Sequence, residues 1–150
     1  MLTQLDTRLA EHHDLGPAVL RIALGALFLA HAYAKAAVYT LPGTAAFFVA
    51  HGFPAWSAYP VFAAELLGGV ALILGVRVRA VALGLIPIML GALVPHVGNG
   101  WMFTNQGGGW EYVAFILAAL SAQALLGSGA FALERARLAP AVARPSVGSC

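Results

Sequence analysis

The feature that most constrains this chain is a set of four long apolar stretches with very few charges. They cover about residues 17–39, 57–76, 78–96 and 109–127. A helix of roughly 20 apolar residues is long enough to cross the hydrocarbon core of a bilayer. Only 9% of the residues are charged and 61% are apolar, whereas about a quarter of an average soluble chain is charged. The sequence therefore predicts an all-α integral membrane bundle of four transmembrane helices.

The distribution of basic residues predicts the orientation of the bundle. The connections at residues 40–56 and 97–108 contain no lysine or arginine, and basic residues beside membrane spans favour the cytoplasmic side. Six arginines fall instead on the two chain termini and the second connection: Arg8, Arg77, Arg79, Arg135, Arg137 and Arg144. We therefore expect both termini in the cytoplasm, with residues 1–16 as a cytoplasmic segment, residues 17–133 as the transmembrane domain and residues 134–150 as a disordered cytoplasmic tail.

The first connection carries its own short apolar segment at residues 43–54. It is too short to cross a membrane and too apolar to lie free in water. Thr44 is a candidate N-cap, Gly52 can end a helix, and Pro54 bars its continuation. We expect a short interfacial helix at the outer mouth of the bundle. Small residues in the spans, among them Gly25, Gly69 and Gly84, are expected to let helix backbones approach closely.

Several function classes find no support in the sequence. The net charge of +2 comes without a basic stripe, so a nucleic-acid partner is not expected. Cys150 is the single cysteine, which rules out a disulfide within the chain. The sequence also contains no phosphate-binding loop and no dinucleotide fingerprint.

Ionisable side chains inside the predicted spans are the strongest indication of a site. Such groups are costly in mid-membrane, at least about 2.5 kcal/mol, and usually mark function. His31 and Lys35 are four residues apart and share a helix face, and three further groups also fall in the outer half of the bundle: Glu65, His96 and Glu111. Two interpretations stay open, an ion-pair network that fixes helix register and a polar pocket that binds a headgroup or passes protons. Arg21, near the inner end, is expected to snorkel to the headgroups.

The third connection, residues 98–112, is longer than a simple turn requires. It contains two asparagines, Asn99 and Asn105, and two tryptophans, of which Trp110 directly precedes Glu111. These side chains offer hydrogen bonds and stacking surface at the predicted outer entrance of the pocket. The same loop is equally suited to act as an interfacial lid that seals the bundle.

A metal or haem is a weaker alternative for the same residues. His31 and His96 lie at similar predicted heights on different helices, which permits bis-histidine haem ligation. Imidazole and carboxylate groups also bind other metals readily. No further signal in the sequence marks either site, so no metal ligands are assigned.

The order of these motifs resembles the DoxX family of small bacterial membrane proteins. The matching blocks are LRIALGALFLAH at 20–31 followed by Lys35, TAAFFVAHGFP at 44–54, AELLGG at 64–69, the arginines after Gly75, Asn99-Gly100 through Asn105 to GWEY at 109–112, and Leu126-Gly127. The resemblance implies a four-helix bundle in the bacterial cytoplasmic (inner) membrane. It also implies a link to membrane redox complexes, because some relatives are subunits of thiosulfate:quinone oxidoreductases.

These observations lead to one main functional hypothesis and two alternatives. The main hypothesis is a quinone-binding subunit of a membrane redox complex, in which His31 or Lys35 holds a quinone carbonyl and Glu65 accepts or relays its proton. His96, Asn99, Asn105, Trp110 and Glu111 would line the entrance. The alternatives are a non-catalytic membrane anchor or assembly factor and a small-solute permease. The expected partners are the bilayer and membrane redox proteins, with a second copy of the chain as a further candidate.

Overall fold

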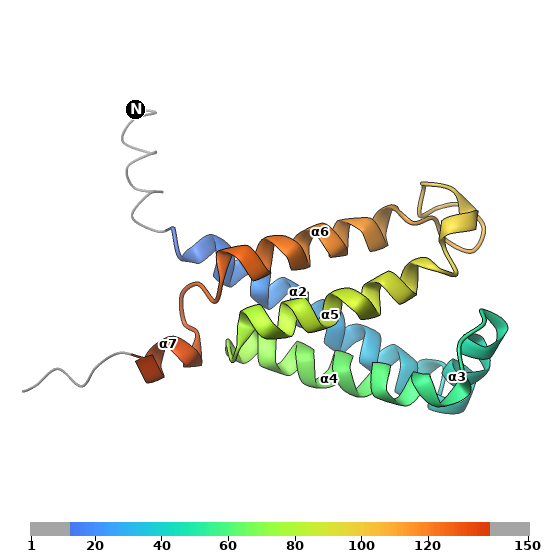
Figure 1. Ribbon diagram of the computed structural model, residues 1–150, viewed down its shortest axis with the longest axis horizontal. Coiled ribbons are helices and arrows are strands. Elements are labelled where there is room, and N and C mark those ends of the chain that lie inside the picture. Colours follow the sequence, from blue (N-terminus) through green and yellow to red (C-terminus); the bar gives the residue numbers. More distant parts are fainter. Residues whose placement is uncertain (1–12, 139–150) are drawn as a thin grey trace, which may run out of the picture.

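A computed structural model describes residues 13–138 of the chain, and over that range the chain is helical with no strand (Figure 1). The long helices are α2 (Leu15–Tyr33), α4 (Ala58–Leu74), α5 (Val78–Leu93) and α6 (Glu111–Leu126). The shorter elements are a π-helix that continues α2 (η1, Ala34–Val38), α3 (Leu41–Ala50), two 3-10 turns (η2, Ala55–Ser57, and η3, Val97–Asn99) and α7 (Leu133–Leu138). The all-α prediction is thus confirmed for the described residues.

The four long helices pack around one apolar core. Helix α2 contacts α4, α4 contacts α5, α5 contacts α6, and α6 contacts α2. Each helix contributes fully buried side chains to the core, including Phe28, Leu72, Leu85, Ile116 and Leu120. Two segments, Leu15–Val38 and Ala55–Leu74, are long and apolar enough to cross a membrane, whereas α5 and α6 are apolar but have only 16 residues each. Four membrane crossings and their orientation therefore stay predictions.

Helices α2 and α4 approach each other closely at two glycines, Gly25 and Gly69. A Cβ atom added to Gly25 would lie 2.8 Å from the carbonyl oxygen of Gly69, and one added to Gly69 would lie 2.9 Å from the carbonyl oxygen of Gly25. Real Cβ atoms do not come so close, so both positions need hydrogen in place of a side chain. The predicted close approach is confirmed for this pair. The prediction is wrong for Gly84, where an added Cβ atom would meet nothing within 4 Å.

The bundle has two distinct ends. At the α3 end lie η1, α3, the start of α4, the end of α5 and the loop of residues 94–110 (Figure 1). At the α7 end lie Asp14, the turn of residues 75–77 and residues 127–138. Gly75 adopts φ +70°, a left-handed conformation that closes α4 and lets the chain turn directly into α5. The tight hairpin predicted between the second and third stretches is therefore confirmed.

Residues of helix α7 bond to the turn between α4 and α5 and to Asp14. The amide of Glu134 donates to the carbonyl of Gly75 (3.1 Å), and its carboxylate accepts from the amide of Val78 (3.3 Å). Arg135 forms an ion pair with Asp14 at 2.5 Å. The segment expected as a disordered tail thus begins with a short helix over Leu133–Leu138. The rest of that tail and residues 1–12 of the N-terminal segment lie outside the described residues.

The short helix between the first two long helices is present, but its cap differs from the prediction. Helix α3 starts at Leu41, and the side chain of Thr40 accepts from the amide of Gly43 at 3.2 Å. Pro42 lies in the first turn, where its missing N–H does no harm, so the helix begins earlier than predicted. Thr44 is instead a buried first-turn residue. Gly52, at φ +84°, follows the end of α3 as expected.

Arg21 does not snorkel. Its side chain is 1% exposed and points into the bundle at the α7 end. One terminal nitrogen donates to the carbonyls of Leu72 and Ile73, each at 2.7 Å, and the other donates to the carbonyl of Ala130 at 3.1 Å. The last carbonyls of a helix have no partners within the helix and carry partial negative charge. A buried guanidinium that satisfies those carbonyls is therefore more favourable than the expected route to the headgroups.

Candidate functional site

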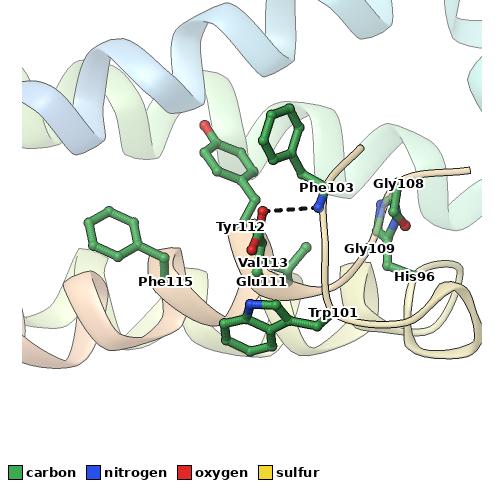
Figure 2. A pocket seen from close by; sticks show the side chains of 9 residues that line it. All are labelled: His96, Trp101, Phe103, Gly108, Gly109, Glu111, Tyr112, Val113 and Phe115. Atoms are coloured by element: carbon green, nitrogen blue, oxygen red, sulfur yellow. Dashed lines mark hydrogen bonds between the residues drawn. The ribbon is translucent and has the colours of Figure 1, made fainter. Parts of the chain in front are cut away.

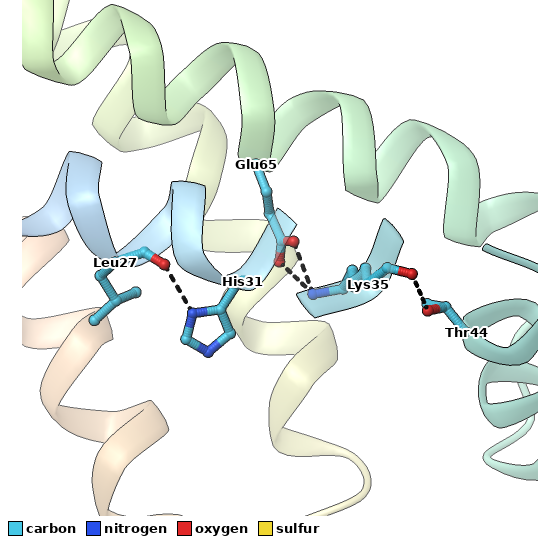
Figure 3. Close-up of polar contacts among 5 residues, drawn as sticks. All are labelled: Leu27, His31, Lys35, Thr44 and Glu65. Carbon is cyan, nitrogen blue, oxygen red and sulfur yellow. Dashed lines mark hydrogen bonds and ion pairs between the residues drawn. The ribbon is translucent and has the colours of Figure 1, made fainter. Parts of the chain in front are cut away.

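The centre of the candidate site is an ion pair between Lys35 and Glu65. The ammonium group of Lys35 lies 2.9 Å from Oε1 and 2.7 Å from Oε2 of Glu65 (Figure 3). The Glu65 side chain is 5% exposed and that of Lys35 is 18% exposed. Charges with so little access to solvent need a partner and several hydrogen bonds, and here each charge neutralises the other. Of the ion-pair network expected among the ionisable side chains, the pair of Lys35 with Glu65 is present.

Local structure holds Lys35 in place. The residue lies in the π-helix that continues α2, and such wide turns are frequent at functional sites. The backbone carbonyl of Lys35 accepts a hydrogen bond from the hydroxyl of Thr44 at 3.2 Å (Figure 3). Helix α3 is thereby tied to the same turn that carries the ammonium group.

The ion pair lines a cavity of about 900 Å³ at the α3 end. Most of its wall is apolar and comes from α3, α5 and α6, with Phe47, Phe48, Phe53, Met89, Val113 and Ile116 among the lining residues. The polar lining groups are few, and His31, His51, His96 and Tyr112 are four of them. Apolar walls with a few placed polar groups are the usual composition of a small-molecule site.

His31 contributes to the cavity without contacting the ion pair. Its Nδ1 atom lies 2.9 Å from the carbonyl oxygen of Leu27, one turn earlier in α2 (Figure 3). The imidazole ring stacks loosely on Tyr112 of α6, with ring centroids 6.5 Å apart and an angle of 17° between the planes. His31, Lys35 and Glu65 therefore share one cavity, as predicted from their positions, and their chemical roles stay predictions.

A second cavity, of about 710 Å³, lies under the loop of residues 94–110 (Figure 2). Its lining includes His96, Trp101, Phe103 and Glu111. One carboxylate oxygen of Glu111 accepts from the amide of Phe103 at 2.9 Å, which fastens the loop to the first turn of α6. His96 and Tyr112 line both cavities, so the two spaces adjoin at these side chains.

The other three predicted entrance residues stabilise the loop itself. The Asn99 amide donates to the carbonyls of Pro95 and Gly108, both at 3.1 Å, and the Asn105 amide donates to the carbonyl of Asn99 at 2.8 Å. The Trp110 ring packs edge-on against Trp101, with centroids 4.4 Å apart. None of the three is among the described residues that line either cavity. Their placement agrees better with the lid interpretation than with an entrance.

Several cavity residues were not predicted from the sequence. Tyr112 and His51 were outside the predicted site, and Thr44 was read only as a helix cap, because each lies near the end of a stretch where polar residues are common. Tyr112 lies in the first turn of α6, Thr44 in the first turn of α3, and His51 directly after α3. Only the packing of α3 and α6 in the bundle brings them to one cavity. Within residues 13–138, no three His, Cys, Asp or Glu side chains are arranged to hold a metal ion.

Comparisons with known proteins agree with this architecture. The DoxX family profile matches residues 16–97, more than half of the chain. A protein of Bacillus subtilis (strain 168) named "Putative oxidoreductase CatD" is 32% identical over 92 residues, which cover 57% of this chain and 67% of that protein. No solved structure matches the chain. The matched region contains α2, α3, α4, α5 and the Lys35–Glu65 pair. The chain therefore belongs to the DoxX family of membrane proteins.

Proposed function

We propose that this DoxX family protein is a four-span protein of the bacterial cytoplasmic membrane whose cavity binds a quinone within a membrane redox complex. In this proposal α2, α4, α5 and α6 each cross the bilayer and both termini lie in the cytoplasm. Large apolar side chains exposed around the bundle support the crossing, among them Val19, Leu67, Leu83, Phe115 and Leu125. Exposed apolar surface on this scale is typical of a face covered by lipid or protein.

The observation that carries the functional proposal is a buried ion pair at the wall of a large apolar cavity. A volume of about 900 Å³ is ample for a substituted aromatic ring and part of an isoprenoid tail, since ligand sites commonly span about 300–1,000 Å³. An ionised pair that served only to fix helix register would not need such a cavity beside it. The arrangement is therefore better suited to a ligand that is mostly apolar and carries polar oxygens at one end.

The residues present fit a quinone. The ammonium group of Lys35 has three N–H donors, of which two are directed at Glu65. The third would be available to an oxygen of the ring, and Glu65 would accept or hold a proton at a carboxylate oxygen. Phe47, Phe48 and Phe53 would contact the apolar part of the ligand. When bound, a quinone supplies the capacity to carry two electrons and two protons between redox partners.

The relative in Bacillus subtilis gives independent support for a redox role. Its name describes an oxidoreductase, and the 92 aligned residues cover 67% of that protein. In the proposed complex, the electrons come from, or pass to, a partner protein in the membrane.

The proposal is tested by quinone binding to the purified full-length protein in mild detergent. A short-chain ubiquinone analogue is titrated while the tryptophan fluorescence is measured. Trp101 lines the second cavity, which adjoins the first, and packs against Trp110. Replacing one partner of a buried ion pair costs about 3–5 kcal/mol, enough to prevent folding, so both are replaced together. The variant Lys35→Met/Glu65→Leu preserves volume and should fold, since apolar substitution of a whole pair is often neutral.

We expect saturable binding by the native protein and at least about a tenfold loss of affinity in the double variant. Glu134→Gln is the matched control, because Glu134 lies at the α7 end and contacts neither cavity. Unchanged affinity in a folded double variant would overturn the quinone site. It would favour the anchor interpretation, in which the ion pair only fixes the register of α2 against α4.

A further inference from the structure

Three histidines of the cavity share one arrangement that the proposed function does not use. His31, His51 and His96 all line the cavity of about 900 Å³. In each of them Nδ1 lies against a backbone carbonyl: Leu27 at 2.9 Å, Phe47 at 2.8 Å, and Gly107 and Gly108 at 3.2 and 3.0 Å, respectively. The three rings come from α2, from the residue after α3 and from the residue before η3. The repetition over three separate elements indicates a property of the site as a whole.

These contacts determine which ring nitrogen carries the proton. A carbonyl oxygen can only accept a hydrogen bond, so Nδ1 must carry the hydrogen and donate it. In a neutral imidazole the other nitrogen, Nε2, then has a lone pair and can only accept. Within residues 13–138, the Nε2 atoms of these three histidines have no hydrogen-bond partner. The three histidines that line the cavity therefore each keep an acceptor at Nε2 that no described side chain or backbone group uses.

A quinone and its reduced form differ in this respect. The oxygens of a quinone are carbonyls and offer only lone pairs, whereas the reduced hydroquinone carries two O–H donors. A carbonyl placed against Nε2 would bring two lone pairs together and leave both unpaired. Lys35 does not discriminate in this way, because its N–H can donate to a carbonyl or to a hydroxyl oxygen. Glu65 also offers lone pairs, but Lys35 already donates to both of its oxygens. The histidines therefore add the acceptors that separate the two redox states.

We propose that the cavity binds the reduced, hydroxyl-bearing form of its quinone in preference to the oxidised form, with the Nε2 atoms of His31, His51 and His96 as acceptors. This inference rests on the proposed function. His31 is the principal acceptor, because it shares a helix face with Lys35. The Nε2 atoms of His51, directly after α3, and of His96, after the end of α5, are the further acceptors. Preferential binding of the reduced form makes the bound couple more oxidising than the free couple.

The test compares the affinities of the oxidised and reduced forms of one short-chain ubiquinone analogue. The full-length protein in mild detergent is titrated anaerobically with each form at about pH 8. Tryptophan fluorescence reports binding without any turnover. We expect the reduced form to bind at least about tenfold more tightly, which corresponds to a rise of about 30 mV in the potential of a two-electron couple.

The decisive variant is His31→Asn/His51→Asn/His96→Asn. The asparagine amide can place its N–H close to the position of Nδ1–H, so the contacts with backbone carbonyls are kept, but it has no counterpart of Nε2. Affinity for the reduced form should fall to about that of the oxidised form, while affinity for the oxidised form should not fall. His13→Asn is the matched control, because His13 lies beside Asp14 at the α7 end.

The outcomes separate this inference from the proposed function. If neither form binds the native protein, the proposed quinone site fails and the inference fails with it. If both forms bind equally, or the oxidised form binds more tightly, the quinone site stands and the inference is overturned. A preference for the reduced form that survives in the triple variant would likewise overturn the role of the histidines.

Discussion

Two cations are buried along the first long helix and its π-helical continuation, and they are stabilised in different ways. Lys35 is neutralised by a carboxylate, at 2.7 and 2.9 Å from its two oxygens. Arg21 is held by three backbone carbonyls. The first pairing can be predicted from the sequence, because opposite charges within apolar stretches must find each other. The second cannot, since a backbone carbonyl is present at every residue and its availability depends on where a helix ends.

Replacing Arg21 should therefore destabilise the protein more than replacing an exposed arginine. In Arg21→Met the carbonyls of Leu72, Ile73 and Ala130 lose their donor. Hydrogen bonds to a charged group contribute about 1.5–3 kcal/mol each, and partial relaxation of the α7 end should leave a loss of about 3 kcal/mol in the free energy of unfolding. Thermal unfolding in detergent, followed by circular dichroism, measures the effect. Arg77→Met, at an exposed turn position, is the control, and equal midpoints for both variants would contradict the prediction.

At the scale of elements, the contact between α2 and α4 places the two partners of the ion pair opposite each other. Lys35 follows α2, Glu65 lies in α4, and the glycines at 25 and 69 allow the two backbones to touch. The existence of the long helices, their hairpin and the short α3 were all predictable from apolar runs and turn residues. The π-helix and the Thr40 cap were not, because both depend on how α3 packs against the end of α2.

The prediction for this contact concerns Gly25→Ala. The added methyl group would lie 2.6 Å from Cγ1 of Ile73 and 2.8 Å from the carbonyl oxygen of Gly69, so α2 and α4 must separate. Overpacking of this kind typically costs about 1–3 kcal/mol, and it should also weaken the quinone affinity by pulling Lys35 from Glu65. Thermal unfolding and the quinone titration measure the two effects.

Gly84→Ala is the matched control for that variant. A Cβ atom at Gly84 meets nothing within 4 Å, and alanine is favoured over glycine in a helix by about 1 kcal/mol. The midpoint of unfolding should therefore stay the same or rise. A similar loss in both variants would show that the close approach of α2 and α4 is not what Gly25 provides.

Over the whole molecule, the two ends of the described chain meet at the α7 end through Asp14 and Arg135. Asp14 precedes α2 and Arg135 lies in α7. The hydrogen bond from Arg135 lowers the pKa of the Asp14 carboxyl below its ordinary value of 3.8, and the same contact raises the pKa of Arg135. The arginine distribution predicts both termini on one side of the membrane. The contact across 121 positions of sequence could not be foreseen, because neither residue belongs to an apolar pattern.

The lowered pKa of Asp14 predicts a pH dependence. A carboxyl group whose pKa is depressed in the folded protein stabilises it above the unfolded value and loses that contribution as the pH falls through the folded value. The native protein should therefore unfold at a higher temperature than Asp14→Asn at about pH 6, and this difference should shrink progressively as the pH is lowered below 3.8. A difference that persists unchanged at the lower pH would show that Asp14 acts through something other than its charge.

The division of charged groups between the two ends has a consequence for energy conversion. Every ionisable residue of the cavity lies at the α3 end, whereas Arg21 lies ten residues before His31, about 15 Å along α2, in the apolar core at the other end. A fixed guanidinium charge inside a bundle is an electrostatic barrier to protons and other cations. Protons taken up or released in the cavity would exchange with the compartment beyond the α3 end alone. In the function proposed above, redox chemistry at this site would thus be vectorial, with its proton release or uptake coupled to one side of the membrane.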